Sequence, residues 1–155
     1  MPTEHVPERI QPKSLDQYLE VQSKPVFQAG MSWRVIESKW PGVREAMNNF
    51  QVGAVAAMGD EQIDALADDT RMIRSRRKIA AIVHNAQKLI ELDEKHNGLR
   101  NYLRSFPDYD ALAKDIKKQF KFMGEMGIYY WLYATSEEVP SYEEYQARQA
   151  KVVKK

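Results

Sequence analysis

Residues 27–36 read Phe27-Gln28-Ala29-Gly30-Met31-Ser32-Trp33-Arg34-Val35-Ile36, and the rest of the chain is organised around this stretch. If the segment is helical, its apolar residues fall on two stripes. One stripe holds Val26, Ala29, Trp33, Ile36 and Trp40, and the other holds Phe27, Met31 and Val35. A helix that is apolar nearly all round is a buried one, so the pattern predicts a core helix. Gly30 costs about 1 kcal/mol relative to alanine inside a helix. It therefore indicates a break or the close approach of a ligand.

The composition is that of one ordinary globular domain. The chain has 155 residues, of which 43% are hydrophobic and 29% charged. It has no apolar run of the roughly 18 residues that a membrane span needs, and no apolar segment near its start that resembles a signal peptide. It contains no cysteine, which excludes disulfides, thiolate metal sites and cysteine nucleophiles. We expect a cytoplasmic monomer.

Helical periods dominate, and no stretch alternates as a strand would. The best-defined helix is predicted over about 75–95, where Ile79, Ile82, Val83, Ala86 and Ile90 form a single stripe. Prolines and glycines divide the rest into short helices. The expected ranges are 14–24, 25–39, 43–49, 52–58, 60–68, 99–105, 109–119, 128–134 and 141–155. The prediction is an all-α fold, a compact bundle of short helices, with an extended arm at 1–13 and a single domain at 14–155.

Charge is segregated although the net charge is only +1. The segment 71–78 contains no acid and holds Arg71, Arg74, Arg76, Arg77 and Lys78. A helix that starts here offers unpaired backbone N–H groups and the positive end of its dipole. Two short helices with this basic connector would make a phosphate seat, neutralising four or five phosphates. The alternative is a solvated basic helix start, which is common in proteins of many kinds.

Several motifs occur in a fixed order along the chain. Gln28-Ala29-Gly30-Met31-Ser32-Trp33 is followed by Val55-Ala56-Ala57-Met58, by Met72 to Ile79 running into Ile82 to Ala86, and by Phe120-Lys121-Phe122-Met123-Gly124. This ordered set resembles the 3-methyladenine DNA glycosylase I (Tag) family over about residues 26–92 and 112–134. The resemblance implies a helix-hairpin-helix unit at 60–95, binding of double-stranded DNA, and removal of an alkylated base that has been flipped out of the duplex.

The resemblance also implies site residues. Gly30 and Met31 would wedge the duplex, Trp33 would line the base pocket, and Gln28 would bond a base edge or a backbone group. Tyr129 or Tyr130 would stack on the base, and Tyr18 is the one pocket candidate in residues 1–24. Lys121, between two phenylalanines, would reach a phosphate. The alternative for Met31, Trp33 and the tyrosines is that they are ordinary core residues.

Two family features have no match here. The family carries an acid a few residues before its Gln-Ala-Gly motif, and an ungapped match places Pro25 there. Glu20 and Glu37 are the substitutes we consider for assisting hydrolysis. The family commonly joins its ends with zinc through two Cys and two His. This chain has Glu137, Glu138 and Pro140 in that region, so we expect no metal and no other cofactor.

Three functions stay open at this point. The first is a zinc-free, Tag-like glycosylase that works at the nucleoid and hydrolyses the N-glycosidic bond of an alkylated purine of the 3-methyladenine type. The second is a non-catalytic relative that binds DNA or damage and has lost the base-reading acid. The third is a helical module whose basic connector meets an acidic protein.

Overall fold

The computed structural model describes residues 7–153, with side chains described for residues 7–149, and this part of the chain is helical without strands. The predicted all-α class is thereby confirmed. The elements, in order, are α1 (Leu15–Gln28), α2 (Trp33–Ala46), the 3₁₀ turn η1 (Asn48–Phe50), α3 (Val52–Ala56), α4 (Asp60–Ala67), α5 (Arg76–His96), α6 (Leu99–Leu103), α7 (Tyr109–Gln119), α8 (Glu125–Ala134) and α9 (Tyr142–Val153).

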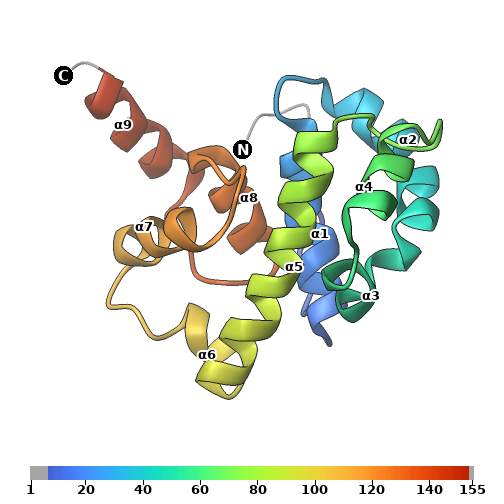
Figure 1. Cartoon of the computed structure of the whole chain (residues 1–155). Helices are drawn as coiled ribbons and strands as arrows, with labels where there is room; N and C mark the ends of the chain where they lie inside the picture. Colours follow the sequence, from blue (N-terminus) through green and yellow to red (C-terminus); the bar gives the residue numbers. More distant parts are fainter. Residues whose placement is uncertain (1–6, 154–155) are drawn as a thin grey trace.

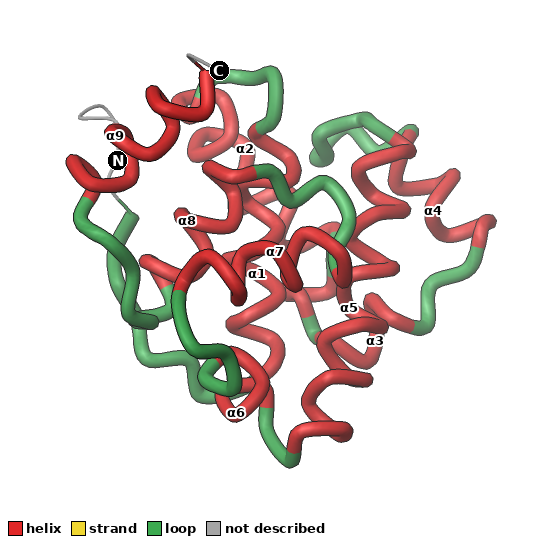
Figure 2. Tube along the Cα trace, turned by 90° about the vertical axis from the view of Figure 1, so that its left-hand side faces the viewer, coloured by secondary structure: helices red, strands yellow, loops and turns green. Residues whose placement is uncertain are grey.

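Helix α5 runs through the middle of the molecule, with α2, α3 and α4 on one side and α7, α8 and α9 on the other (Figure 1). It packs on α1, α3, α4 and α6, while α1 packs on both α5 and α8. Short loops connect these helices (Figure 2). In the part of the chain that the structure describes, no helix is long and apolar enough to cross a bilayer.

The core forms along the stripes that the sequence predicts for α5. Ile79, Ile82 and Ala86 are fully buried, and so is Leu89. Trp131 of α8 is also fully buried, and its indole N–H donates to the backbone oxygen of Tyr18 at 3.0 Å. Because a buried indole N–H needs an acceptor, this bond fixes α8 against α1.

The first two helices begin and end at places other than those predicted. The expected break at Lys24-Pro25 is wrong, since α1 continues through Pro25 to Gln28. The expected turn at Pro41-Gly42 is also wrong, since α2 includes both residues. The chain instead turns between Ala29 and Ser32. Burial of Pro25, Val26 and Phe27 against α5 and α8 favours the continuous helix over the local preference of proline for a helix start.

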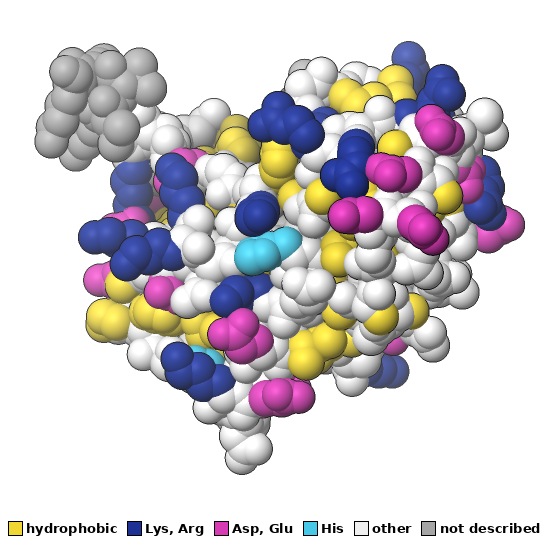
Figure 3. Space-filling model, in the orientation of Figure 1, with side chains coloured by type: hydrophobic (Ala, Val, Ile, Leu, Met, Phe, Trp, Pro, Cys, Tyr) yellow, Lys and Arg dark blue, Asp and Glu magenta, His cyan; other side chains and the backbone are white. Residues whose placement is uncertain are grey.

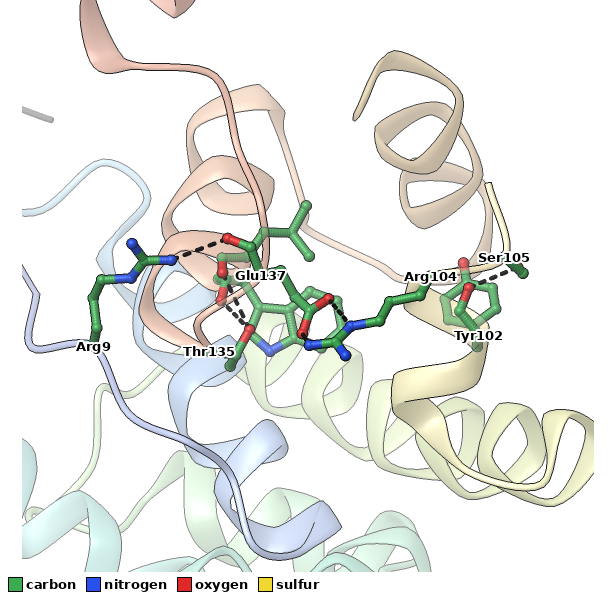
Figure 4. A network of polar contacts seen from close by, with 8 residues as sticks. Arg9, Tyr102, Arg104, Ser105, Thr135 and Glu137 are labelled. Atoms are coloured by element: carbon green, nitrogen blue, oxygen red, sulfur yellow. Dashed lines mark hydrogen bonds and ion pairs between the residues drawn. The ribbon is translucent and has the colours of Figure 1, made fainter. Parts of the chain in front are cut away.

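The chain's N-terminal segment is tied to the end of α8. Residues 7–13 have no regular structure, as predicted for the arm, while residues 1–6 of the predicted arm lie outside the described residues. Figure 4 shows Arg9 and Arg104 approaching Glu137 from opposite sides. Arg9 donates to the backbone oxygens of Tyr133 and Glu137, and Arg104 donates to both carboxylate oxygens of Glu137 at 3.1 and 3.3 Å. Glu137 is buried, so a paired charge joins three segments here.

Candidate functional site

The turn between α1 and α2 carries the stretch that the sequence singles out. Gly30 has φ +81°, a conformation that favours glycine, and an added Cβ would meet no atom within 4 Å. The side-chain amide of Gln28 donates to the backbone oxygen of Met31 at 2.8 Å. Ser32 then caps α2 by accepting from the N–H of Val35. Local bonds therefore shape the turn, and Gly30 stays exposed on it.

Lys78 clamps this turn to α5. Its ammonium donates to the backbone oxygens of Phe27 at 2.9 Å and Ala29 at 2.6 Å, which are unpaired carbonyls at the end of α1. Partial burial lowers the pKa of Lys78 from its ordinary value. The side chain expected to bind phosphate is thus engaged with the backbone that positions Gln28 and Gly30.

A second turn, between α7 and α8, is also held by α5. The fully buried Asn85 donates to the backbone oxygen of Lys121 at 3.0 Å and accepts from its N–H at 2.8 Å. His84 Nε2 lies 3.2 Å from the backbone oxygen of Gln119. Phe122 follows with φ +57°, a left-handed conformation that costs a non-glycine residue roughly 1–2 kcal/mol. The two bonds of Asn85 hold the chain in this conformation.

An open hollow of about 560 Å³ lies between the two turns. Its lining residues are Pro25, Gln28, Ala29, Trp33, Phe122, Gly124, Glu125, Met126, Gly127 and Tyr130. The rings of Trp33 and Tyr130 stack with centroids 4.9 Å apart and planes inclined by 16°. Trp33 is half-buried and lines a hollow that is large enough for a purine. Three predicted pocket residues, Gln28, Trp33 and Tyr130, therefore meet in one place.

Two other predicted pocket residues lie elsewhere. Tyr129 is buried among the tyrosines of α8 and α9, and its hydroxyl donates to the backbone oxygen of Pro140 at 2.7 Å. Tyr18 is buried edge-on against Trp131. Neither lines the hollow, because Tyr129 packs toward α9 and Tyr18 packs against Trp131 in the core. Both occupy core positions, as the alternative interpretation allows.

The candidate acids gather behind Tyr130. A second hollow, of about 470 Å³, is lined by Glu20, Glu37, Lys24 and Tyr130 among others. Glu37 pairs with Lys24 at 3.1 Å, and Glu20 accepts from the indole N–H of Trp40 at 3.0 Å. Burial, followed by the negative charge of Glu37, raises the pKa of Tyr130 well above its usual range. Tyr130 thus separates the aromatic hollow from the carboxylate of Glu37.

Several residues at the hollow were not singled out by the sequence. Phe122 and Met126 stand at its mouth, 40% and 41% exposed, and Glu125 supplies the one carboxylate among its lining residues. Glu125 lies 3.6 Å from Lys117. Pro25 packs closely against Gly127, since a Cβ added to Gly127 would lie 3.5 Å from the proline ring. The Phe-Lys-Phe-Met-Gly motif was the available signal for Phe122, but only the fold shows that this ring is exposed.

The basic cluster divides into engaged and available side chains. Arg71 pairs with Asp69 at 2.7 Å and Glu45 at 3.1 Å, and Arg76 pairs with Asp64 at 2.6 Å and Asp60 at 3.3 Å. The bonds from Arg71 lower the pKa of Asp69 from 3.8 to about 2. Acids from α4 and its surroundings therefore partly neutralise the seat that the sequence predicts as purely basic.

Arg74 and Arg77 are both exposed. Arg74 makes no hydrogen bond or ion pair with any residue that the structure describes, and the Arg77 guanidinium lies 5.4 Å from the Phe122 ring centroid. The Lys121 side chain is exposed too, since only its backbone bonds Asn85. Lysines and arginines spread over this view of the molecule, with acids mixed among them on the α4 side (Figure 3).

Other parts of the molecule offer less. Within residues 7–153, no group of three or more His, Asp or Glu side chains is placed to hold a metal ion. A larger hollow, of about 930 Å³, lies between the α6–α7 region and the start of α9, and none of the predicted pocket or DNA-binding residues lines it. The aromatic hollow and its cationic rim are therefore the candidate site.

The fold and site together define a small all-helical protein with an aromatic pocket beside a cationic rim, and known proteins share this architecture. The family model described as methyladenine glycosylase matches residues 16–119. The chain belongs to this family.

Individual relatives agree with the family match. The chain is 29% identical to DNA-3-methyladenine glycosylase 1 of Escherichia coli (strain K12) over 144 residues, covering 74% of this chain and 77% of that protein. A crystal structure of 3-methyladenine DNA glycosylase I (TAG) matches with a TM-score of 0.71 at 26% identity, over 81% of each chain. The Staphylococcus aureus enzyme, solved to explain its recognition of 3-methyladenine, matches with a TM-score of 0.70 at 25% identity, over 81% of this chain and 78% of that one.

Proposed function

We propose that this protein is a DNA base-excision repair glycosylase that hydrolyses the N-glycosidic bond of an alkylated purine, of the 3-methyladenine type that its relatives are named for. The observation that carries the proposal is the open hollow in which Trp33 presents an aromatic face beside Gln28 and Tyr130. It works as a monomer on double-stranded DNA at the nucleoid.

The pocket suits a flipped, positively charged base. Trp33 and Tyr130 already contact each other, so the base lies on the pocket side of this pair and not between the rings. Alkylation of a ring nitrogen in a purine nucleotide leaves the base cationic, and an aromatic face attracts a cation. The side-chain amide of Gln28, at the edge of the same hollow, bonds the edge of the base.

The chemistry asks little of the protein because the alkylated base is a good leaving group. The bond between the sugar C1′ and the base nitrogen breaks, and its electron pair neutralises the base. Water adds to C1′ and releases a proton. A carboxylate that steadies the positive sugar would speed this step. Glu37, which acts on Tyr130 behind the pocket, is the nearer of the two acids considered from the sequence, and Glu125 lines the hollow itself.

The DNA lies across the two turns and the start of α5. The Gly30–Met31 turn enters the duplex, since Gly30 is exposed and Lys78 holds the turn in place. Arg74 and Arg77 contact phosphates beside the first turn of α5, whose N–H groups point the same way. We interpret α4, its connector and α5 as the helix-hairpin-helix unit.

The test is release of the free base. Duplex DNA treated with a methylating agent is incubated with the protein, and the released purines are separated by chromatography. We expect 3-methyladenine from the wild-type protein, about a hundredfold less from Trp33→Ala, and partial activity from Trp33→Phe, which keeps an aromatic face. Arg148→Ala, which changes a surface ion pair with Asp110, is the matched control. No released purine at high protein concentration would overturn the proposal.

A further inference from the structure

Phe122 is an unusual exposed residue. Val35, Phe122 and Met126 are the large apolar side chains found exposed in the described part of the chain, and two of them stand at the mouth of the aromatic hollow. Single exposed apolar residues are common in proteins. Phe122 differs because its backbone is left-handed, at φ +57°. Phe50 shares this conformation but is buried in the core, so Phe122 is unusual in combining a left-handed backbone with an exposed ring.

The backbone directly before this ring is held by α5. Asn85 is fully buried, and its side-chain amide donates to the C=O and accepts from the N–H of Lys121, the residue before Phe122. The next helix, α8, begins three residues later at Glu125. An exposed side chain on a rigid backbone loses less conformational freedom when it binds, so the ring is preorganised for a partner.

The surroundings of the ring are cationic. The Arg77 guanidinium lies 5.4 Å from the ring centroid, and Lys121 is adjacent in sequence and exposed. Aromatic rings interleaved with cations are how proteins bind unstacked bases and their phosphates. The charge of this rim therefore favours a nucleic acid over an apolar protein segment as the partner.

The first turn of α5 stands between Phe122 and the predicted wedge. Lys78 reaches the turn that carries Gly30 and Met31, while Arg77, one residue earlier, reaches Phe122. Met31 is half-buried, whereas Phe122 is 40% exposed. The two turns thus form the two sides of one pocket mouth. The Phe122 side chain is more exposed than that of Met31.

We propose that Phe122 is a second wedge: its ring stacks on a base of the damaged duplex next to the extruded nucleotide, across the pocket mouth from Met31. Arg77 and Lys121 hold the phosphates that flank this base. The inference rests on the proposed function, because a duplex with one nucleotide turned out is the ligand. It adds a contact that discriminates a duplex with an extruded nucleotide from an intact one, since the ring cannot insert between bases that are fully stacked.

Affinity for two duplexes tests the proposal. One duplex carries a stable abasic-site analogue with 2-aminopurine beside it, and the other is undamaged. For Phe122→Ala we expect about tenfold weaker binding to the abasic duplex, as for loss of one base–aromatic stack, and unchanged binding to the undamaged one. The 2-aminopurine stacks on the Phe122 ring in the wild-type complex, so its fluorescence is lower there than in the Phe122→Ala complex, where one face of the base is uncovered. Phe122→Trp retains both properties.

Val35→Ala is the matched control, since Val35 is equally exposed but does not line the hollow. Thermal melting of each variant shows whether the fold is kept. Unchanged affinity in Phe122→Ala, equal weakening on both duplexes, or the same loss in Val35→Ala overturns the inference. Absence of abasic-selective binding by the wild-type protein overturns it too. The base-release assay separates this inference from the proposed function. If the protein binds abasic DNA selectively but releases no purine, the proposed catalysis is wrong and the role of Phe122 stands.

Discussion

At the scale of single residues, basic side chains only a few positions apart make different contacts. Arg74 is exposed to solvent, Arg76 pairs with two acids of α4, and Lys78 turns inward to backbone carbonyls. A cation that already has good partners gains little from a phosphate, since binding would require it to give those partners up. The basic run in the sequence therefore overstates the number of charges available to a ligand.

Lys78 tests this distinction directly. Lys78→Met keeps the aliphatic stem and removes the two bonds to Phe27 and Ala29. We expect a loss of about 1–3 kcal/mol in the free energy of unfolding, as for hydrogen bonds to a charged group, measured by chemical denaturation. The salt dependence of DNA affinity stays the same because no phosphate contact is lost. Unchanged stability together with a slope shallower by about one would identify Lys78 as a phosphate ligand instead.

At the scale of elements, α5 is the support on which the site is built. Lys78 in its first turn holds the end of α1, and Asn85, two turns on, holds the segment before α8. The far end of α8 is fixed separately, through Glu137 and its arginines (Figure 4). Tyr130 keeps its place beside Trp33 because α8 is anchored at both ends.

The anchor at the end of α8 can be weakened without touching the pocket. Arg104→Ala leaves the buried Glu137 carboxylate without its bidentate partner. Breaking a fully buried pair costs about 3–5 kcal/mol, but the Arg104 side chain is 57% exposed and solvent screens the pair. We expect a loss of about 1–3 kcal/mol in the free energy of unfolding, measured by urea denaturation. Arg34→Ala, on the exposed side of α2, is the control. A loss no larger than that of the control would mean that this ion pair does not anchor the end of α8.

At the scale of the whole molecule, charge and shape act together. The net charge is only +1, and acids lie among the cations on the α4 side (Figure 3). Among the cations predicted to bind phosphate, the exposed ones without an acidic partner in the described part of the chain are Arg74 and Arg77 near the start of α5 and Lys121 before α8. DNA affinity should therefore depend on salt less steeply than five free charges would imply.

The salt slope measures how many phosphates are bound. For two or three phosphates, log Kd should change with log salt by a slope of roughly 1.8 to 2.7 in magnitude, compared with roughly 3.5 to 4.5 for four or five. Replacing Arg74 and Arg77 with alanine should reduce the slope by about two. Replacing Arg71 and Arg76 should leave it nearly unchanged and lower stability slightly. If this second pair reduces the slope as much as the first, the arginines leave their acids to bind DNA.

The sequence by itself determined much of this protein. Periodicity is local, so the stripe on α5 and the all-helical class could be predicted. The Gln-Ala-Gly-Met-Ser-Trp motif also indicated the family, and it placed Gln28 and Trp33 at one hollow.

Only the tertiary structure decided the rest. Pro25 and Pro41 lie inside helices, although an internal proline costs a helix about 3 kcal/mol. Pro25 is buried, and the exposed Pro41 is flanked in α2 by the buried Trp40 and Val43. Tyr130 lines the pocket and Tyr129 does not, because their neighbours on α1, α2 and α9 differ. Which cations are paired, and why Phe122 is exposed, depend on residues distant in sequence, such as Asp64 and Asn85. Contacts between residues distant in sequence produce no periodic pattern, so they could not be predicted from the sequence.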